Sequence, residues 1–216
     1  MIFNSFEYIL FLPIVFILYW VAFKLPKIQN CLIVVASYIF YGLWDYRFLF
    51  LIAFTTLCSF VSGILIAKNL NKKGSSAKYI CILNVVINLM ILGIFKYYNF
   101  FVNSFVDLMS LFHVDIQVST LGIILPVGIS FYTFQAIGYS IDVYRKKIEA
   151  THDVIAFFAF ISFFPQLVAG PIERASNLLP QFFEKRVFDY EKAADGMRQI
   201  LWGLFKKIVI ADNCAE

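Results

Sequence analysis

Charged residues are scarce in this sequence, and their scarcity excludes an ordinary soluble domain. Only 15% of the 216 residues are charged and 61% are hydrophobic, whereas a soluble domain is about 25% charged and about 45–50% apolar. Long apolar runs occupy residues 8–23, 31–40, 48–67 and 79–95. Because a membrane span needs about 20 mostly apolar residues, the sequence predicts an all-α, polytopic transmembrane helical bundle.

Clustered cysteines and a glycine-rich phosphate loop are also lacking. The cysteines stand singly, with no CxxC pair and no Cys/His cluster, at Cys31, Cys58, Cys81 and Cys214. A free cysteine behaves as a small hydrophobic residue, so neither a metal site nor a disulfide framework is predicted. Without a phosphate-binding loop, the sequence itself predicts no bound cofactor.

The first apolar run is expected to be a retained span. Glu7 precedes it and bulky residues such as Trp20 end it, whereas a cleavable signal has a basic start and a small-residue exit.

Basic loops alternate with neutral or acidic ones along the first 150 residues. The basic side chains are Lys24, Lys27, Lys68, Lys72, Lys73, Lys78, Arg145, Lys146 and Lys147. Since short cytoplasmic loops hold the excess of Lys and Arg, the N-terminus is predicted outside and the loops near 24–27, 68–78 and 145–150 inside. Five spans follow, at about residues 6–24, 29–44, 48–67, 79–100 and 122–144. Topology after residue 150 stays undetermined, because acidic and basic residues balance between residues 173 and 198.

Membrane lipid is the expected partner of these basic residues. Juxtamembrane basic clusters normally set orientation and meet anionic lipid, so nucleic acid is not expected.

A polar stripe marks the apolar segment at residues 125–145, LPVGISFYTFQAIGYSIDVYR. Steps of four and three residues place its polar positions on one helical face. That face comprises Gly128, Tyr132, Gln135, Tyr139, Asp142 and Lys146. An amide or carboxylate within a bilayer is costly unless it faces the bundle interior, a partner or a water-filled cavity. The stripe therefore predicts either hydrogen bonds between helices or the wall of a lumen that admits a polar substrate.

The following apolar segment is expected to be a broken or re-entrant helix. Residues 154–164 would rise only about 16 Å before Pro165, and a second break is expected at residues 170–171. Irregular backbone at membrane depth is tolerated only where protein buries it or water reaches it. Gln166, Glu173 and Arg174 are therefore site candidates, with a local ion pair as the alternative for the last two.

Structural roles are expected for the remaining polar features. Residues 178–192 mix charges and aromatics, which favours a helix lying at the membrane interface or, alternatively, a solvated connector. Asp189 is predicted to cap the next helix, with Glu191 in its first turn. His113, in a predicted outer loop, and His152, in a predicted capping segment, are not expected to be catalytic.

Three long motifs in order carry a family resemblance. They are ILPVGISFYTFQAIGYSIDVYR, FISFFPQLVAGPIERASNLLPQF and GLFKKIVIADN, and the early stretches FNSFEYILFLPIVFILYW and SYIFYGLWDYRFL fit the same pattern. The sequence resembles the bacterial alginate O-acetyltransferase branch of the membrane-bound O-acyltransferase family, which is similar to the teichoic-acid D-alanyl transfer protein. The resemblance implies a bundle around a tunnel in a bacterial cytoplasmic (inner) membrane. An acyl group would pass there to a hydroxyl of a cell-surface polysaccharide such as alginate.

The resemblance also assigns the tunnel wall and the extent of the chain. The tunnel would be walled by the two proline-marked motifs, so the candidates are Tyr132, Gln135, Tyr139, Asp142, Gln166, Glu173 and Arg174. The family's general-base histidine lies beyond the segment that matches KKIVIADN. Residues 1–216 are therefore expected to be a single membrane domain, the N-terminal part of a longer acyltransferase, and to be inactive alone.

Several functional alternatives stay open. The acyl donor could be acetyl-CoA, a carrier protein or an acylated partner, and the polysaccharide could be reached through partner proteins. A transporter would also have intramembrane polar stripes and broken helices, although no pair of interrupted helices repeats in two halves. A non-catalytic assembly subunit would need no lumen.

Overall fold

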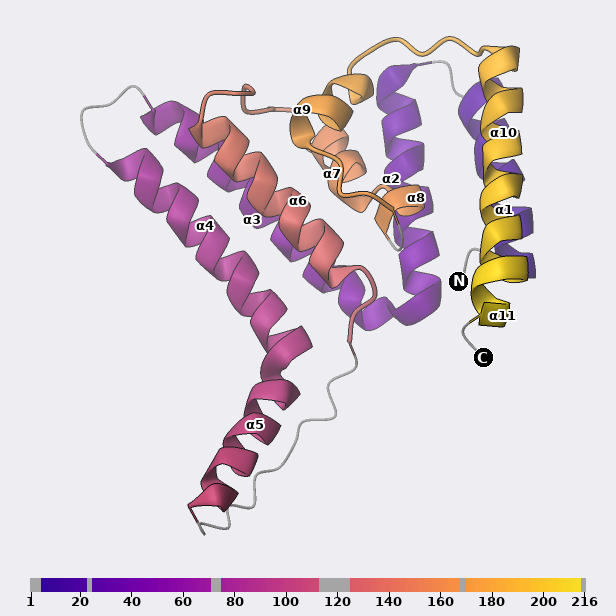
Figure 1. The fold of residues 1–216 in the computed structure, drawn as a ribbon. Helices are drawn as coiled ribbons and strands as arrows, with labels where there is room; N and C mark the ends of the chain where they lie inside the picture. Colours follow the sequence, from indigo (N-terminus) through magenta and orange to yellow (C-terminus); the bar gives the residue numbers. More distant parts are fainter. Residues whose placement is uncertain (1–4, 23–24, 71–74, 113–124, 168–169, 215–216) are drawn as a thin grey trace. The chain divides into compact units, whose positions relative to one another are not determined.

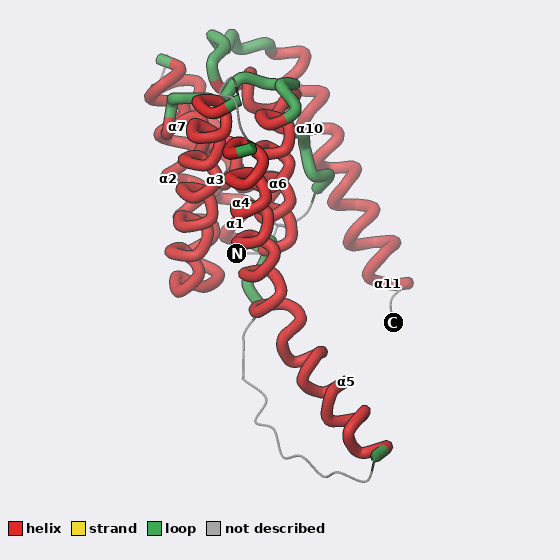
Figure 2. The backbone as a smooth tube through the Cα atoms, turned by 90° about the vertical axis from the view of Figure 1, so that its left-hand side faces the viewer, coloured by secondary structure: helices red, strands yellow, loops and turns green. Residues whose placement is uncertain are grey.

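The computed structural model describes residues 5–22, 25–70, 75–112, 125–167 and 170–214, and no strand occurs among them (Figures 1 and 2). Two helical stretches, Pro26–Asn69 and Ser76–Leu111, are long and apolar enough to cross a membrane. Shorter apolar helices cover Phe6–Val21 and Val154–Leu167. The predicted all-α membrane class is thereby confirmed.

The chain divides into two compact units. The first unit contains Met1–Gln29 and Glu184–Glu216, and the second contains Asn30–Phe183.

The first unit is built from helices at the two ends of the chain. They are α1 (Phe6–Ile17) with a π-helical extension (Leu18–Ala22), and α10 (Tyr190–Phe205) with a π-helical turn (Lys206–Ala211) and α11 (Asp212–Cys214). Asp189 caps α10 as predicted, because its carboxylate accepts a hydrogen bond from the Lys192 amide at 3.2 Å. That hydrogen bond lowers the pKa of the Asp189 carboxyl, which keeps the capping group ionised.

An aromatic cluster joins the residues before α10 to the end of α1. The Phe188 ring lies 5.3 Å from the Trp20 ring and 6.2 Å from the Phe16 ring, measured between centroids. The Arg186 guanidinium lies 5.6 Å from the Tyr19 ring centroid. Edge-to-face aromatic and cation–π contacts of this kind stabilise packing beyond simple burial.

The second unit contains the helices that position the candidate site. They are α2 (Pro26–Asp45, from Asn30 onward), α3 (Leu49–Asn69), α4 (Ser76–Leu92), α5 (Tyr98–Leu111), α6 (Ile129–Tyr144), α7 (Val154–Ser162), α8 (Phe164–Leu167) and α9 (Ala175–Leu178). Short 3-10 turns cover Tyr46–Phe48 and Leu179–Phe182, and a π-helical turn covers Gly93–Tyr97. Helices α3, α4 and α6 run side by side (Figures 1 and 2).

Buried amides and hydroxyls hold α3, α4 and α6 together. The Asn84 amide nitrogen donates to Ser140 Oγ at 2.7 Å, and Ser59 Oγ donates to Asn84 Oδ1 at 3.3 Å. Asn88 donates to the Asn84 carbonyl at 2.9 Å, and all four residues are at most 1% exposed. Polar side chains that form hydrogen bonds between helices in this way stabilise helix association inside membranes.

Helix α6 begins where the backbone of Gly128 turns left-handed. Gly128 has a φ of +74°, and a Cβ built there would lie 2.2 Å from the Leu167 carbonyl oxygen. Only glycine satisfies both the positive φ and this close approach. The LPVG motif therefore fixes the start of α6 against α8, and helix begins at Ile129, later than the predicted span at 122–144, whose first three residues lie outside the described part.

The predicted helix break occurs, two residues before Pro165. Helix α7 ends at Ser162, Phe163 is non-helical and α8 begins at Phe164. The Phe164 amide donates to Ser37 Oγ of α2 at 3.2 Å. A neighbouring helix thus satisfies a backbone group that the break would otherwise leave unpaired.

Two further segments differ from the simple expectation. Residues 183–189 are non-helical, so the middle of the 178–192 stretch is a connector, the alternative left open by the sequence. The fourth helical stretch continues through α5 to Leu111, beyond the expected span end at residue 100. Residues 113–124, including His113, lie outside the described residues.

Candidate functional site

A polar cavity of about 220 Å³ lies between α6 and the segment before α9. Helix α6 contributes Phe134, Gln135, Gly138, Ile141 and Asp142, and the end of α6 contributes Arg145 and Lys147. The opposite wall is Ile172, Glu173, Arg174 and Ala175. Four residues from the two proline-marked motifs, predicted separately, therefore meet at one cavity: Gln135, Asp142, Glu173 and Arg174.

Gln135 supplies an unpaired amide at this cavity. Its side chain is only 4% exposed, and its Nε2 atom has no hydrogen-bond partner among the described residues. A buried donor without a partner costs about 1–3 kcal/mol. Because Gln135 borders the cavity while its Nε2 is fully buried, the side chain would have to turn toward the cavity to donate to an acceptor oxygen of a ligand.

Charges of both signs line the same cavity without pairing with one another. Among the described residues, neither Asp142 nor Glu173 forms an ion pair with Arg145, Lys147 or Arg174. Instead, Glu173 accepts a hydrogen bond from the Asn177 amide at 2.8 Å. The local Glu173–Arg174 ion pair considered as an alternative is thus not formed. A carboxylate within reach of a hydroxyl can act as general base and a guanidinium can bind an anion, so the cavity holds groups for both tasks.

Tyr139 does not line this cavity. Its hydroxyl accepts a hydrogen bond from the Thr151 amide at 3.2 Å, and its ring centroid lies 4.6 Å from that of Phe157. The side chain is completely buried against Gly63 of α3. These contacts describe a packing role that joins α3, α6 and α7.

Tyr132 and Gln166 also lie apart from the cavity lining. Tyr132 is completely buried, and its hydroxyl has no hydrogen-bond partner among the described residues. The hydroxyl of Tyr41 in α2 donates to the Val127 carbonyl at 2.9 Å. Gln166, in α8, is 8% exposed, and within the described ranges its Nε2 has no hydrogen-bond partner.

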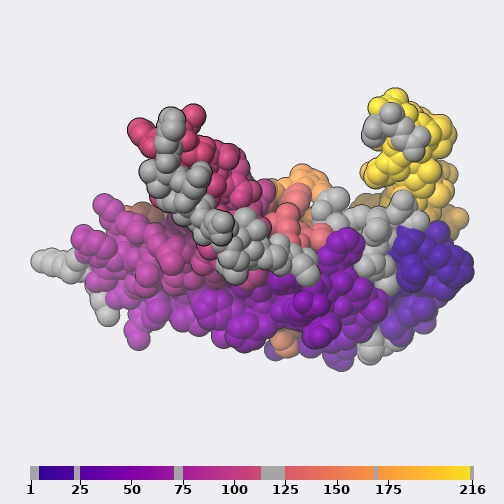
Figure 3. Space-filling view, turned by 90° about the horizontal axis from the view of Figure 1, so that it is seen from below, coloured from indigo at the N-terminus to yellow at the C-terminus, as the bar shows by residue number. Residues whose placement is uncertain are grey.

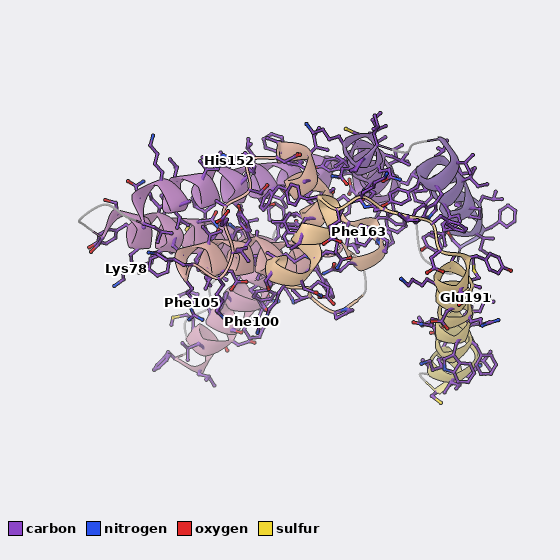
Figure 4. All side chains as sticks on the ribbon, turned by 90° about the horizontal axis from the view of Figure 1, so that it is seen from above. Lys78, Phe100, Phe105, His152, Phe163 and Glu191 are labelled. Carbon is purple, nitrogen blue, oxygen red and sulfur yellow. The ribbon has the colours of Figure 1, made fainter. Side chains whose placement is uncertain are left out.

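His152 belongs to a different cavity, of about 610 Å³. Its neighbours in that lining include Lys146, Lys147 and Glu149. Asp153 next to it caps α7 by accepting from the Ala156 amide at 3.0 Å, which confirms the predicted capping segment. Lys147 lines both cavities, so they adjoin at the end of α6. Figure 4 shows His152 in the loop before α7.

Sequence reasoning missed two groups of polar residues in this unit. Arg145 and Lys147 were interpreted only as topology signals, yet both line the cavity. Asn84 and Asn88 are four residues apart inside an apolar run and were overlooked. They lie at the centre of the buried hydrogen-bond network between α3, α4 and α6. The signal was present, because amides within a membrane span are expected to face the interior.

The fold and the cavity together define a helical membrane protein with polar and charged groups gathered at the end of α6, and the chain is homologous over its whole length to membrane O-acetyltransferases. It is 40% identical over 216 residues to the probable alginate O-acetylase AlgI of Pseudomonas aeruginosa, covering all of this chain and 41% of that protein. It is 39% identical to the probable alginate O-acetylase AlgI of Azotobacter vinelandii, again over all of this chain and 42% of that protein.

A third relative is the peptidoglycan O-acetyltransferase of Helicobacter pylori, 33% identical over 95% of this chain and 43% of that protein. The chain thus spans about two fifths of the length of these relatives. No family model and no solved structure matches the chain. The resemblance inferred from the three motifs is confirmed by the alginate O-acetylases.

Proposed function

We propose that this chain is the N-terminal part of a membrane O-acyltransferase that transfers acetyl groups to hydroxyls of a cell-surface or exported polysaccharide. The single observation that carries the proposal is the meeting of Gln135, Asp142, Glu173 and Arg174 at one cavity, in a chain homologous to O-acetyltransferases. Acetyl-CoA, a carrier protein and an acylated membrane partner are all compatible donors. The acceptor would be reached through partner proteins.

The proposed role of the cavity is to bind an oxygen of the acyl group or the acceptor. The buried Gln135 amide donates to that oxygen, and Arg145 and Arg174 supply positive charge beside it. Asp142 and Glu173 are the carboxylates that could accept a proton from a hydroxyl.

Replacing Gln135 by leucine in the full-length protein tests this role. Transfer should fall by up to about tenfold, because one hydrogen bond contributes about 0.5–1.5 kcal/mol. Folding should be preserved, since the removed Nε2 atom has no hydrogen-bond partner in the part of the chain that the structure describes. The measurement is the O-acetyl content of exported polysaccharide in cells whose only acyltransferase is the variant.

Thr133→Val is the matched control on the same helix. Thr133 is completely buried and its hydroxyl also lacks a hydrogen-bond partner in the described part of the chain, but it does not line the cavity. The control should retain transfer. If Gln135→Leu instead lowers melting temperature and activity together, Gln135 serves to join helices and the proposed role is wrong.

The proposed location is the cytoplasmic (inner) membrane of a bacterium, with the N-terminus outside. Under this topology Ser75, at the start of α4, faces the cytoplasm. Ser75→Cys, in a variant without the native cysteines, should not react with an impermeant maleimide in intact cells and should react after permeabilisation. Ser110→Cys, near the far end of α5, should react from outside. Reversed labelling would overturn the topology.

The 216-residue chain expressed alone is proposed to insert in membranes without catalysing transfer. The cavity that Gln135, Asp142, Glu173 and Arg174 share has no histidine among the described residues of its lining, and His152 is exposed elsewhere. An acyl-transfer assay on the isolated chain should give only background turnover. Turnover abolished by His152→Ala or His113→Ala would place the catalytic centre within these residues and contradict the proposal.

A further inference from the structure

The helical stretch Ser76–Leu111 loses its contact with the bundle partway along its length. The buried positions of α4 recur every three or four residues and end at Leu92: they are Ala77, Cys81, Asn84, Asn88 and Leu92. Helix α5, which follows, has no buried residue. Figure 3 shows α5 projecting from the surface formed by α3 and α4.

A polar contact marks the point where the helix leaves the bundle. Lys96 Nζ donates to Ser130 Oγ at 3.1 Å, which ties the π-helical turn before α5 to the start of α6. A helix rises about 1.5 Å per residue, so the stretch from Ser76 to Lys96 covers about 30 Å, the thickness of the hydrocarbon core. Lys96 thus lies where a span that starts at Ser76 would reach the opposite membrane boundary.

Helix α5 beyond this boundary is amphipathic. Its polar residues recur at helical spacing on one side, at Asn99, Asn103, Asp107 and Ser110. The opposite side carries Phe101, Phe105 and Leu108, whose side chains are 64%, 50% and 48% exposed. Figure 4 labels Phe100 and Phe105 on α5. A helix with this pattern and one charged residue is suited to the boundary between headgroups and acyl chains.

An apolar groove of about 770 Å³ runs through the bend between α4 and α5. Met90 of α4 and Ile94 of the π-helical turn line it together with Tyr98, Phe101, Phe105 and Leu108 of α5. Met90 and Ile94 are 60% and 50% exposed on the apolar surface of the span. The groove is therefore continuous with the surface of α4 that contacts lipid when the span is in a bilayer.

We propose that α5 lies along the membrane surface at the end of the span remote from Ser76, with a phospholipid acyl chain seated in the groove between α4 and α5. The apolar side of α5 enters the acyl region by about 5–10 Å, and the side with Asn103 and Asp107 faces water. Because α5 has no Lys or Arg, apolar burial drives this contact and anionic headgroups are not required.

Spin-label accessibility in nanodiscs of phosphatidylcholine tests the proposal on the full-length protein. Single cysteines at Phe105, Phe101 and Asn103, in a variant without native cysteines, are labelled with a nitroxide. Collision rates with oxygen, which concentrates in lipid, and with a water-soluble nickel chelate are then measured. Met90→Cys on α4 is the lipid-facing reference, and each labelled variant is checked for monodisperse elution.

The oxygen-to-nickel ratio should be high at Phe105 and Phe101, approaching that at Met90, and low at Asn103. Adding phosphatidylglycerol should leave these ratios unchanged. Low collision rates with both reagents at Phe105 and Phe101 would mean that another part of the protein or a second copy covers the face. High nickel collision rates at all three positions would place α5 in water. Either result overturns the proposal.

Discussion

Gly128→Ala should prevent folding or lower the melting temperature more than Gly63→Ala or Gly138→Ala. A left-handed backbone costs a non-glycine residue about 1–2 kcal/mol. The added Cβ would also lie 2.2 Å from the Leu167 carbonyl oxygen. That second effect dominates, because the obstacle is backbone and cannot turn away as a flexible side chain would.

Gly138→Ala, ten residues along the same helix, is the matched control. A Cβ at Gly138 meets nothing within 4 Å, and alanine within a helix is favoured over glycine by about 0.5–1 kcal/mol. Gly138→Ala should therefore melt at the same temperature or higher, measured by thermal unfolding of detergent-purified protein. Equal melting temperatures for the two variants would show that Gly128 does not contact α8 closely.

Gly63→Ala should destabilise the protein by about 1–3 kcal/mol through overpacking. A Cβ on Gly63 would lie 2.5 Å from Cε1 of the Tyr139 ring. The ring cannot move away easily, since the Thr151 amide holds its hydroxyl and the Phe157 ring packs against it. The methyl group would therefore separate α3 from α6.

A double-mutant cycle isolates this contact. Tyr139→Leu alone should be destabilising, because it removes the hydroxyl that accepts from Thr151. In that background Gly63→Ala should have little further effect on melting temperature, which corresponds to a coupling energy of about 1–3 kcal/mol. Strictly additive losses would be inconsistent with a ring that packs directly on Gly63.

The sequence predicted which residues share a face of α6 better than it predicted what that face contacts. Gln135 and Asp142 line the polar cavity, whereas Tyr139 packs against Gly63 of α3. Helical periodicity gives the angle of a side chain around its own axis. It contains no information about which neighbouring helix has a small residue at the matching height.

The helix break was predictable and its position was not. Pro165 lacks an amide hydrogen and disfavours helical backbone at the residue before it. The helix instead ends at Ser162 and Phe163 is non-helical, because Ser37 of α2 provides an acceptor for the Phe164 amide. An acceptor supplied from a distant part of the chain cannot be inferred from local sequence.

Helix α5 was missed for a different reason. A search for uninterrupted apolar runs ends near residue 95, and the amphipathic residues that follow have too many polar side chains to qualify as a span. Their helical periodicity was the available signal.

The hydrogen bond between Ser37 and Phe164 joins residues that are 127 positions apart. At a synthesis rate of about 5–20 residues per second, the ribosome needs about 6–25 s to extend from one residue to the other. Helix α2 is therefore synthesised well before Ser37 can accept the hydrogen bond from Phe164. The hydrogen bond from Asn30 to the Phe182 carbonyl, 152 positions away, forms later still. The polar side of α2 is completed late in translation, so assembly of this interior follows the emergence of the broken helix.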